Sequence, residues 1–143
     1  MELHKIIIAD DHSFIRLGLV QILKEEYPKL EIIEVGDAES LLNEVALQDF
    51  DLVISDLEMP GKNGFEALAQ IKLLKPDLPV LILSIYPEDL YAIKLLKAGA
   101  SGYIFKNSAP EQLIEAVHRI ESGKRFITPN IAEKLMNIEL DLV

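Results

Sequence analysis

Residues 80–83 read Val-Leu-Ile-Leu, an uninterrupted apolar run between Pro79 and Ser84 in the middle of the chain. A second such run, Ile-Ile-Ile, occupies residues 6–8 near the N-terminus. Strands with one face in water alternate apolar and polar residues, whereas strands buried on both faces are apolar throughout. The two runs therefore predict strands of a parallel sheet that is covered by helices on both faces.

Five short segments rich in β-branched residues alternate with amphipathic segments of helical length. The predicted strands are His4–Asp10, Leu30–Val35, Asp51–Asp56, Pro79–Ser84 and Ser101–Phe105. The predicted helices are Ser13–Glu26, Ala38–Leu47, Gly64–Leu74, Pro87–Lys97 and Ala109–Glu121. Strict alternation with short connections implies right-handed crossovers. The sequence therefore predicts a doubly wound α/β domain with a five-stranded parallel sheet.

The ends of these helices carry local signals. Asn63 and Ser108 each precede a helix and have a glutamate three positions on, Glu66 and Glu111, which is the spacing of a capping box. Gly99 follows the fourth helix and suits the left-handed conformation of a C-terminal cap. We therefore expect side-chain caps at the starts of the third and fifth helices.

Composition limits the class of protein. The chain has 143 residues, half of them hydrophobic, which suffices for one domain with a buried core. It contains no cysteine, so disulfides and cysteine-based zinc sites are excluded. A net charge of −10 without a basic cluster argues against nucleic-acid binding by this chain itself. No apolar stretch has the form of a signal peptide or the length of a bilayer span, so we expect a cytoplasmic protein without membrane contact.

The pattern changes after Gly123. Residues 124–129 are typical of a connector, and Asn130–Ile138 has the apolar stripe of one more amphipathic helix, formed by Ile131, Leu135 and Ile138. This helix follows no strand that it would cover. We therefore predict a domain over residues 1–123, and we interpret 124–143 as a linker and the start of a helix that extends toward something absent from the chain.

Polar residues stand where four of the predicted strands end. They are Asp10 and Asp11 at the end of the first strand, Asp56 at the end of the third, Ser84 at the end of the fourth and Lys106 after the fifth. In an open parallel sheet, binding sites lie outside the carboxyl ends of the strands, so these groups converge on one edge.

The chemistry of this group points to phosphate. Three neighbouring carboxylates repel one another unless a cation neutralises them, and an all-oxygen acidic cluster suits Mg²⁺. A carboxylate nucleophile such as Asp56 can form an acyl phosphate, Lys106 can pair with the phosphate charge, and the Ser84 hydroxyl can donate to it. Taken singly, Asp11 or Asp37 is more simply a helix cap and Lys106 a surface lysine. Capping does not explain all five groups at these strand ends.

These residues resemble the receiver domains of two-component response regulators. The matching stretches are residues 8–12 (IADDH), 51–61 (DLVISDLEMPG), 83–84 (LS) and 99–106 (GASGYIFK). Together they cover the chain from Met1 to about Gly123. The resemblance implies a flavodoxin-like fold and a role as a signalling switch rather than an enzyme, since such a domain catalyses only its own phosphorylation and dephosphorylation.

The resemblance also implies roles for individual residues. Asp56 would accept a phosphoryl group from a sensor histidine kinase or a small phosphodonor. Mg²⁺ would be bound by Asp11, Asp56 and the backbone carbonyl of Glu58, with Asp10 helping, partly through water. Phosphorylation would shift a population between two states. Three further residues would respond to the phosphate: Lys106 by pairing with it, Ser84 by moving toward it, and Tyr103 by rotating inward.

The end of the chain resembles the LuxR/NarL-type subclass. Its marks are Lys106-Asn107-Ser108 in place of a Lys-Pro pair and the stretch 123–129 (GKRFITP). In that subclass a linker leads to a helix-turn-helix domain that binds DNA and regulates transcription. The chain stops before such a domain, so we expect an excised receiver rather than a naturally short protein. The sequence departs from the usual receiver pattern at two positions. Ile85 is larger than the residue usual there, so it could narrow access to the phosphate. Asn107 stands where many receivers have proline, so it removes their cis X-Pro bond.

Residues 12–20 begin the first helix with apolar residues on more than one face. In receivers the kinase-side partner docks near this helix, and dimers of the subclass often use the first and fifth helices. A homodimer through these helices is therefore a hypothesis, because excess apolar residues are more often core or scattered surface.

Three other functions remain as alternatives. A Mg²⁺-dependent phosphohydrolase with an aspartate nucleophile usually has a second Asp two positions on, where this chain has Glu58. An interaction module that works without phosphorylation would not need all five site groups. A nucleotide-binding domain would need a glycine-rich loop after the first strand, which is missing.

Overall fold

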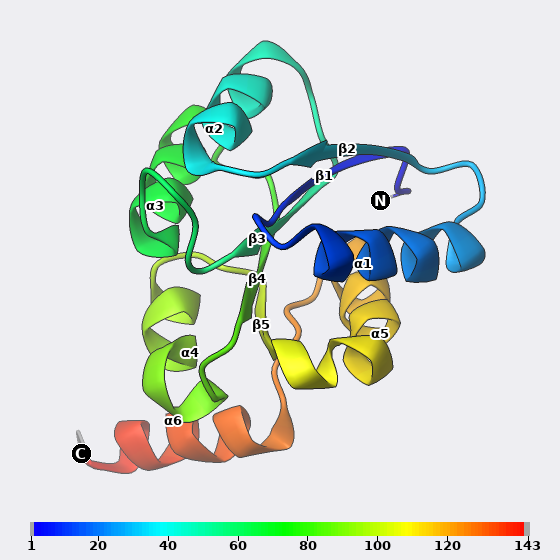
Figure 1. The fold of residues 1–143 in the computed structure, drawn as a ribbon. Coiled ribbons are helices and arrows are strands. Elements are labelled where there is room, and N and C mark those ends of the chain that lie inside the picture. The colour runs from blue at the N-terminus through cyan, green and yellow to red at the C-terminus, as the bar shows by residue number, and fades with distance from the viewer. Residues whose placement is uncertain (1, 142–143) are drawn as a thin grey trace.

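The computed structural model describes residues 2–141, with the backbone alone for 88–90 and 138–141. It contains one parallel sheet in the order β2-β1-β3-β4-β5 (Figure 1). The strands are β1 (Lys5–Ala9), β2 (Glu31–Val35), β3 (Leu52–Asp56), β4 (Val80–Ser84) and β5 (Gly102–Phe105). The helices are α1 (Ser13–Glu26), α2 (Ala38–Leu47), α3 (Gly64–Leu74), α4 (Glu88–Lys97), α5 (Ala109–Glu121) and α6 (Pro129–Asp141), with a 3₁₀ turn over Lys106–Ser108 before α5.

The doubly wound arrangement predicted from the sequence is confirmed. Helices α1 and α5 cover one face of the sheet and α2, α3 and α4 cover the other (Figure 1). Four of the predicted helices have the observed bounds, and the fourth begins one residue later than predicted. The strands are one or two residues shorter than predicted, although residues just outside them, such as Asp10 and Ser101, still donate backbone hydrogen bonds to the neighbouring strand.

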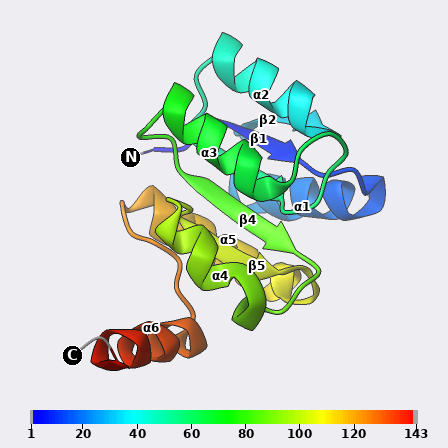
Figure 2. The ribbon, with the colours of Figure 1, turned by 90° about the vertical axis from the view of Figure 1, so that its left-hand side faces the viewer.

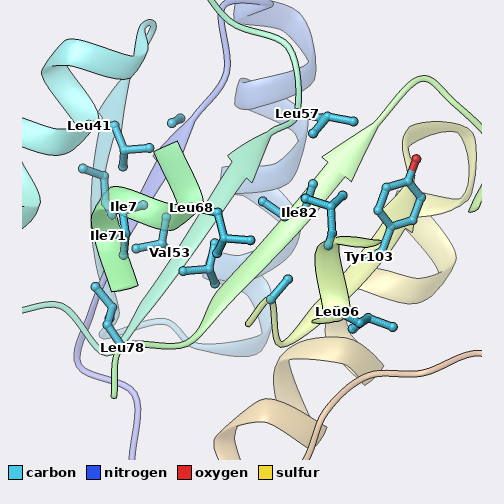
Figure 3. Packing of buried hydrophobic residues seen from close by; sticks show 14 of the residues in the cluster. Ile7, Leu41, Val53, Leu57, Leu68, Ile71, Leu78, Ile82, Leu96 and Tyr103 are labelled. Atoms are coloured by element: carbon cyan, nitrogen blue, oxygen red, sulfur yellow. The ribbon is translucent and has the colours of Figure 1, made fainter. Parts of the chain in front are cut away.

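Alternate residues of each strand supply the two hydrophobic layers, because successive side chains of a strand point to opposite faces. Ile6 and Ile8 face the layer under α1 and α5, whereas Ile7 faces the layer under α2, α3 and α4. In the second layer, Leu68 and Ile71 of α3 pack over the strands (Figure 3). The central strands β3 and β4 are fully buried, which agrees with their apolar runs at residues 52–54 and 80–83.

The caps follow the sequence only in part. Asn63 accepts a hydrogen bond from Glu66 N at 3.0 Å, as predicted, and Asp37 caps α2 in the same way through Ser40 N at 2.7 Å. The predicted cap at Ser108 is wrong. Its side chain accepts no capping hydrogen bond, because the preceding 3₁₀ turn already places Ser108 in a helical conformation.

The segment after Gly123 packs on the domain rather than extending away from it. Phe126 pairs with Gly102 beside the edge strand β5, and it is 4% exposed. Helix α6 then lies beneath α4 (Figure 2), where Ile131 is 1% exposed and Leu135 packs against the same cluster. The sequence offers this helix no partner within the chain, and the structure supplies one in α4. The interpretation of residues 124–143 as a linker toward a missing part stays a prediction. The side chain of Ile138, the third residue of the predicted stripe, lies outside the described residues.

A close approach explains the glycine of β5. A Cβ at Gly102 would lie 3.0 Å from the side chains of Leu81 and Phe126, so the bare backbone allows the connector to lie against the sheet. Within residues 2–141, no helix is long and apolar enough to cross a membrane.

Candidate functional site

The carboxyl ends of the strands bring four polar residues to one edge of the sheet. Asp10 directly follows β1, Asp56 and Ser84 are the last residues of β3 and β4, and Lys106 directly follows β5. All four are buried. Asp10 is held by the loop that starts α1, where its Oδ1 accepts a hydrogen bond from His12 N at 2.7 Å.

Lys106 joins the two buried acids. Its Nζ donates to Asp56 Oδ2 at 2.9 Å and lies 3.0 Å from Asp10 Oδ2. The second contact has the distance of an ion pair without the direction of a hydrogen bond, and Asp10 Oδ2 has no hydrogen-bond partner among the described residues. The side chain of Lys106 is 4% exposed, so its charge acts away from bulk water.

Burial and charge oppose each other in this group. Burial raises the pKa of Asp56, and the nearby Asp10 carboxylate adds to this, while the Lys106 ammonium acts in the opposite direction. Burial alone would lower the pKa of Lys106, but its contacts with Asp56 and Asp10 outweigh burial and raise it. The Lys106 ammonium is therefore held in its charged form. Its single positive charge is shared by two carboxylates, Asp10 and Asp56.

His12 completes the cluster, and the sequence reasoning gave it no role. Its Nδ1 lies 3.1 Å from Asp10 Oδ1, 3.2 Å from Asp11 Oδ1 and 3.9 Å from Asp56 Oδ2. It is also 3.4 Å from Lys106 Nζ. The signal was present, since His12 follows the paired aspartates directly, but the sequence does not give the direction of the ring.

The cluster fits a divalent cation. Ligand atoms of Asp10, Asp11, His12 and Asp56 all lie within 4.8 Å of one another. A buried carboxylate oxygen of Asp10 without a hydrogen-bond partner is the kind of group that a cation would satisfy. Asp11 does not cap α1, because His12 occupies the N-cap position. The side chain of Asp11 is 37% exposed, and its Oδ1 contacts His12 in the cluster.

The loop after β3 also contacts this group. Glu58 N donates to Asp56 Oδ1 at 3.3 Å, which places the loop backbone beside the acid. The role predicted for the backbone carbonyl of Glu58 stays a prediction, as does the identity of Mg²⁺ as the cation.

The side chains of Ser84 and Tyr103 both form hydrogen bonds with the backbone of Tyr86. Ser84 Oγ accepts a hydrogen bond from Tyr86 N at 2.9 Å, and the Tyr103 hydroxyl donates to Tyr86 O at 2.5 Å. Tyr103 is fully buried beside Ile82 (Figure 3). Its rotation on phosphorylation stays a prediction. Ile85, which follows Ser84, is 56% exposed, and its effect on access to the phosphate stays a prediction.

Comparison with known proteins agrees with this geometry. The model of the response regulator receiver domain family matches residues 6–118. Among curated proteins, DegU of Brevibacillus brevis is 37% identical over 133 residues, covering 92% of this chain and 56% of DegU. The response regulator GacA of Pseudomonas aeruginosa is 31% identical over 132 residues, covering 92% of this chain and 61% of GacA. The chain thus spans about three fifths of the length of these relatives.

Solved structures give the same result. A LuxR-family two-component response regulator from Aurantimonas sp. SI85-9A1 superposes with a TM-score of 0.83 at 31% identity, covering 97% of this chain and 99% of that chain. The isolated receiver domain of RcsB from Salmonella enterica, solved with the phosphomimetic BeF₃⁻, gives a TM-score of 0.83 at 26% identity, with 92% and 98% covered. The chain therefore belongs to the family of two-component response regulator receiver domains, in the LuxR/NarL-type branch.

Proposed function

We propose that Asp56 is the residue that accepts a phosphoryl group, and that its phosphorylation switches the domain. The observation that carries the proposal is the placement of the buried Asp56 carboxylate between Lys106 and the loop backbone at Glu58. One side of the carboxylate thus has a fixed positive charge and the other a backbone donor. A transferred phosphoryl group needs both kinds of partner.

The reaction is a displacement at phosphorus. A carboxylate oxygen of Asp56 forms a bond to the phosphorus atom, the bond between phosphorus and the donor breaks, and the leaving group keeps that electron pair. Asp56 becomes an acyl phosphate. Attack by water returns the carboxylate and inorganic phosphate, so the chain modifies itself and is not an enzyme for a separate substrate.

The cation of this proposal is Mg²⁺. Asp11, Asp56 and the carbonyl of Glu58 would hold it, with Asp10 assisting. Bound Mg²⁺ supplies positive charge that offsets the phosphoryl oxygens. Lys106 supplies charge to the same group from the side of β5, and Ser84 supplies a hydroxyl donor once it leaves Tyr86 N.

The partners in this proposal follow from membership of the response regulator family. We expect a sensor histidine kinase as the phosphodonor, with a cytoplasmic location. The kinase-docking face would be α1, where Phe14 is 89% and Leu17 is 62% exposed. A homodimer through α1 and α5 would use part of the same face. RcsB has been solved bound to promoter DNA in the presence of BeF₃⁻, which supports control of transcription through a separate helix-turn-helix domain.

Intact mass spectrometry after incubation with acetyl phosphate and Mg²⁺ tests the proposal. We expect one phosphoryl adduct on the wild-type chain, none on Asp56→Asn, and none when EDTA removes the metal. Asp51→Asn is the matched control, because Asp51 accepts hydrogen bonds from His4 N and Lys5 N at the opposite end of the sheet. An adduct that persists in Asp56→Asn would show that another residue is the acceptor. If the wild type stays unmodified with acetyl phosphate and also with a kinase, the proposal is wrong.

A further inference from the structure

We infer that His12 makes the acidic cluster a site for divalent transition-metal ions such as Ni²⁺, with its imidazole nitrogen as a ligand that Mg²⁺ does not use. The inference rests on the metal centre of the proposed function and deepens it. In this inference, His12 determines whether the site prefers transition-metal ions over Mg²⁺.

Two distances from His12 Nδ1 are those of neighbouring ligands around one ion. At a metal–ligand distance of about 2.1 Å, neighbouring ligands lie about 3.0 Å apart in an octahedron and about 3.4 Å apart in a tetrahedron, and opposite ligands lie about 4.2 Å apart. His12 Nδ1 lies 3.1 Å from Asp10 Oδ1 and 3.2 Å from Asp11 Oδ1. Its distance of 3.9 Å to Asp56 Oδ2 lies between the values for neighbouring and opposite ligands. The nitrogen is therefore spaced as a ligand beside Asp10 and Asp11, and a small shift of the His12 or Asp56 side chain would bring Asp56 into the same shell.

The donor set determines which ions gain from it. Mg²⁺ takes oxygen ligands and keeps several waters, so it gains little from an imidazole. Ni²⁺, Co²⁺, Cu²⁺ and Zn²⁺ bind imidazole nitrogen well, and their affinities for a mixed nitrogen and oxygen site exceed that of a hard ion. Three carboxylates with one imidazole are thus a better site for these ions than three carboxylates alone.

Two further observations concern the charge of the cluster and access to it. Asp10 is fully buried, and the Lys106 ammonium 3.0 Å from its Oδ2 also pairs with Asp56, so one positive charge is shared between two buried carboxylates. His12 is positioned by its own backbone, since His12 N donates to Asp10 Oδ1. The imidazole is 56% exposed, so an ion can reach the nitrogen directly from solvent.

A simpler explanation gives the same distances. A ring with a proton on Nδ1 would donate to Asp10 Oδ1 at 3.1 Å and pair with Asp11 without binding any metal. In that case His12 competes with cations of every kind for the carboxylates. The two explanations predict opposite effects of removing the ring on Ni²⁺ binding.

Isothermal titration calorimetry of the tag-free chain separates them. Wild type and His12→Gln are each titrated with Ni²⁺ and with Mg²⁺. We expect His12→Gln to bind Ni²⁺ about tenfold more weakly or worse, since even outer-shell partners change metal affinity by this factor. We expect its Mg²⁺ affinity to stay within about twofold of wild type, which also shows that the site is still folded. The Co²⁺ absorption spectrum gives a second readout, because loss of a nitrogen ligand shifts its visible bands.

The matched control is the double variant His4→Gln, His118→Gln, which removes the other two histidines of the chain. Its Ni²⁺ affinity should equal that of wild type. Unchanged or tighter Ni²⁺ binding by His12→Gln, with Mg²⁺ binding intact, would overturn the inference and leave the proposed function standing. If the wild type binds neither ion, the metal centre of the proposed function fails, and this inference fails with it.

Discussion

The Lys106 ammonium donates a hydrogen bond to Asp56 Oδ2 at 2.9 Å, although the two residues are 50 positions apart in the sequence. The same ammonium lies 3.0 Å from the fully buried Asp10. One buried cation thus serves two buried carboxylates, and the carboxyl ends of β1, β3 and β5 hold the three groups together.

Lys106→Met should destabilise the fold at neutral pH without divalent cations. It leaves Asp10 and Asp56 buried without the ammonium, and breaking a buried ion pair on one side costs about 3 kcal/mol. Burial already raises the pKa of Asp56, so the loss of stability caused by its charged carboxylate is present at neutral pH and shrinks as acid protonates Asp56. Urea unfolding at several pH values measures this effect. The exposed Lys124→Met is the control, and equal losses in both variants at neutral pH would contradict the argument.

Tyr103→Phe should lower the free energy of unfolding by about 1 kcal/mol, because it removes a buried hydrogen bond to Tyr86 O. Asp56 and Lys106 keep their contact, so labelling by acetyl phosphate should still occur. Urea unfolding gives the first result and intact mass the second. Tyr91→Phe is the control, since the Tyr91 ring packs edge-on against Tyr86 and Phe65. A variant as stable as wild type would show that this hydrogen bond does not hold the ring inward.

The fold and the place of the site could be predicted from short-range patterns. Apolar runs such as residues 80–83 identify buried strands, and helix bounds such as Ser13–Glu26 follow from periodicity and end signals. The convergence of Asp10, Asp56 and Lys106 then follows from topology, because parallel strands end at one edge. None of these steps needs the direction of a side chain.

The remaining features depend on tertiary packing. The apolar stripe of α6 predicts that Ile131 is buried but does not identify α4 as its partner. The pairing of His12 Nδ1 with the acids depends on a ring torsion, which spacing does not determine. The cap expected at Ser108 fails because the short turn from Lys106 changes the backbone before the helix starts.

Ile131→Ala should lower the free energy of unfolding by about 3 kcal/mol, if α6 belongs to the same cooperative unit as the sheet. Ile131 is 1% exposed in the cluster under α4, so its truncation leaves a cavity. Met136→Ala in the same helix is the control. Met136 is 64% exposed, and its truncation should change stability by less than about 0.5 kcal/mol. Equal small effects in both variants would show that α6 unfolds independently, and denaturant unfolding measures both.

Tyr27 should be the tyrosine whose titration reports the contact between α1 and α5. Burial raises its pKa to about 12, helped by Glu121, whose Oε1 accepts a hydrogen bond from the Tyr27 hydroxyl at 3.3 Å. The neutral phenol is favoured in the fold, so its stabilising contribution is complete below pH 10 and is lost as the pH rises through about 12.

Ultraviolet absorption of phenolate after a rapid pH jump, before unfolding, measures this titration. The component near pH 12 should be absent from Tyr27→Phe, and in urea the wild-type component should return to about pH 10. Glu121→Gln should lower the pKa of Tyr27, because it removes the carboxylate charge but keeps an oxygen acceptor. If the Tyr27 component of the folded chain titrates near pH 10, the hydroxyl is solvated and its contact with Glu121 does not link α1 to α5.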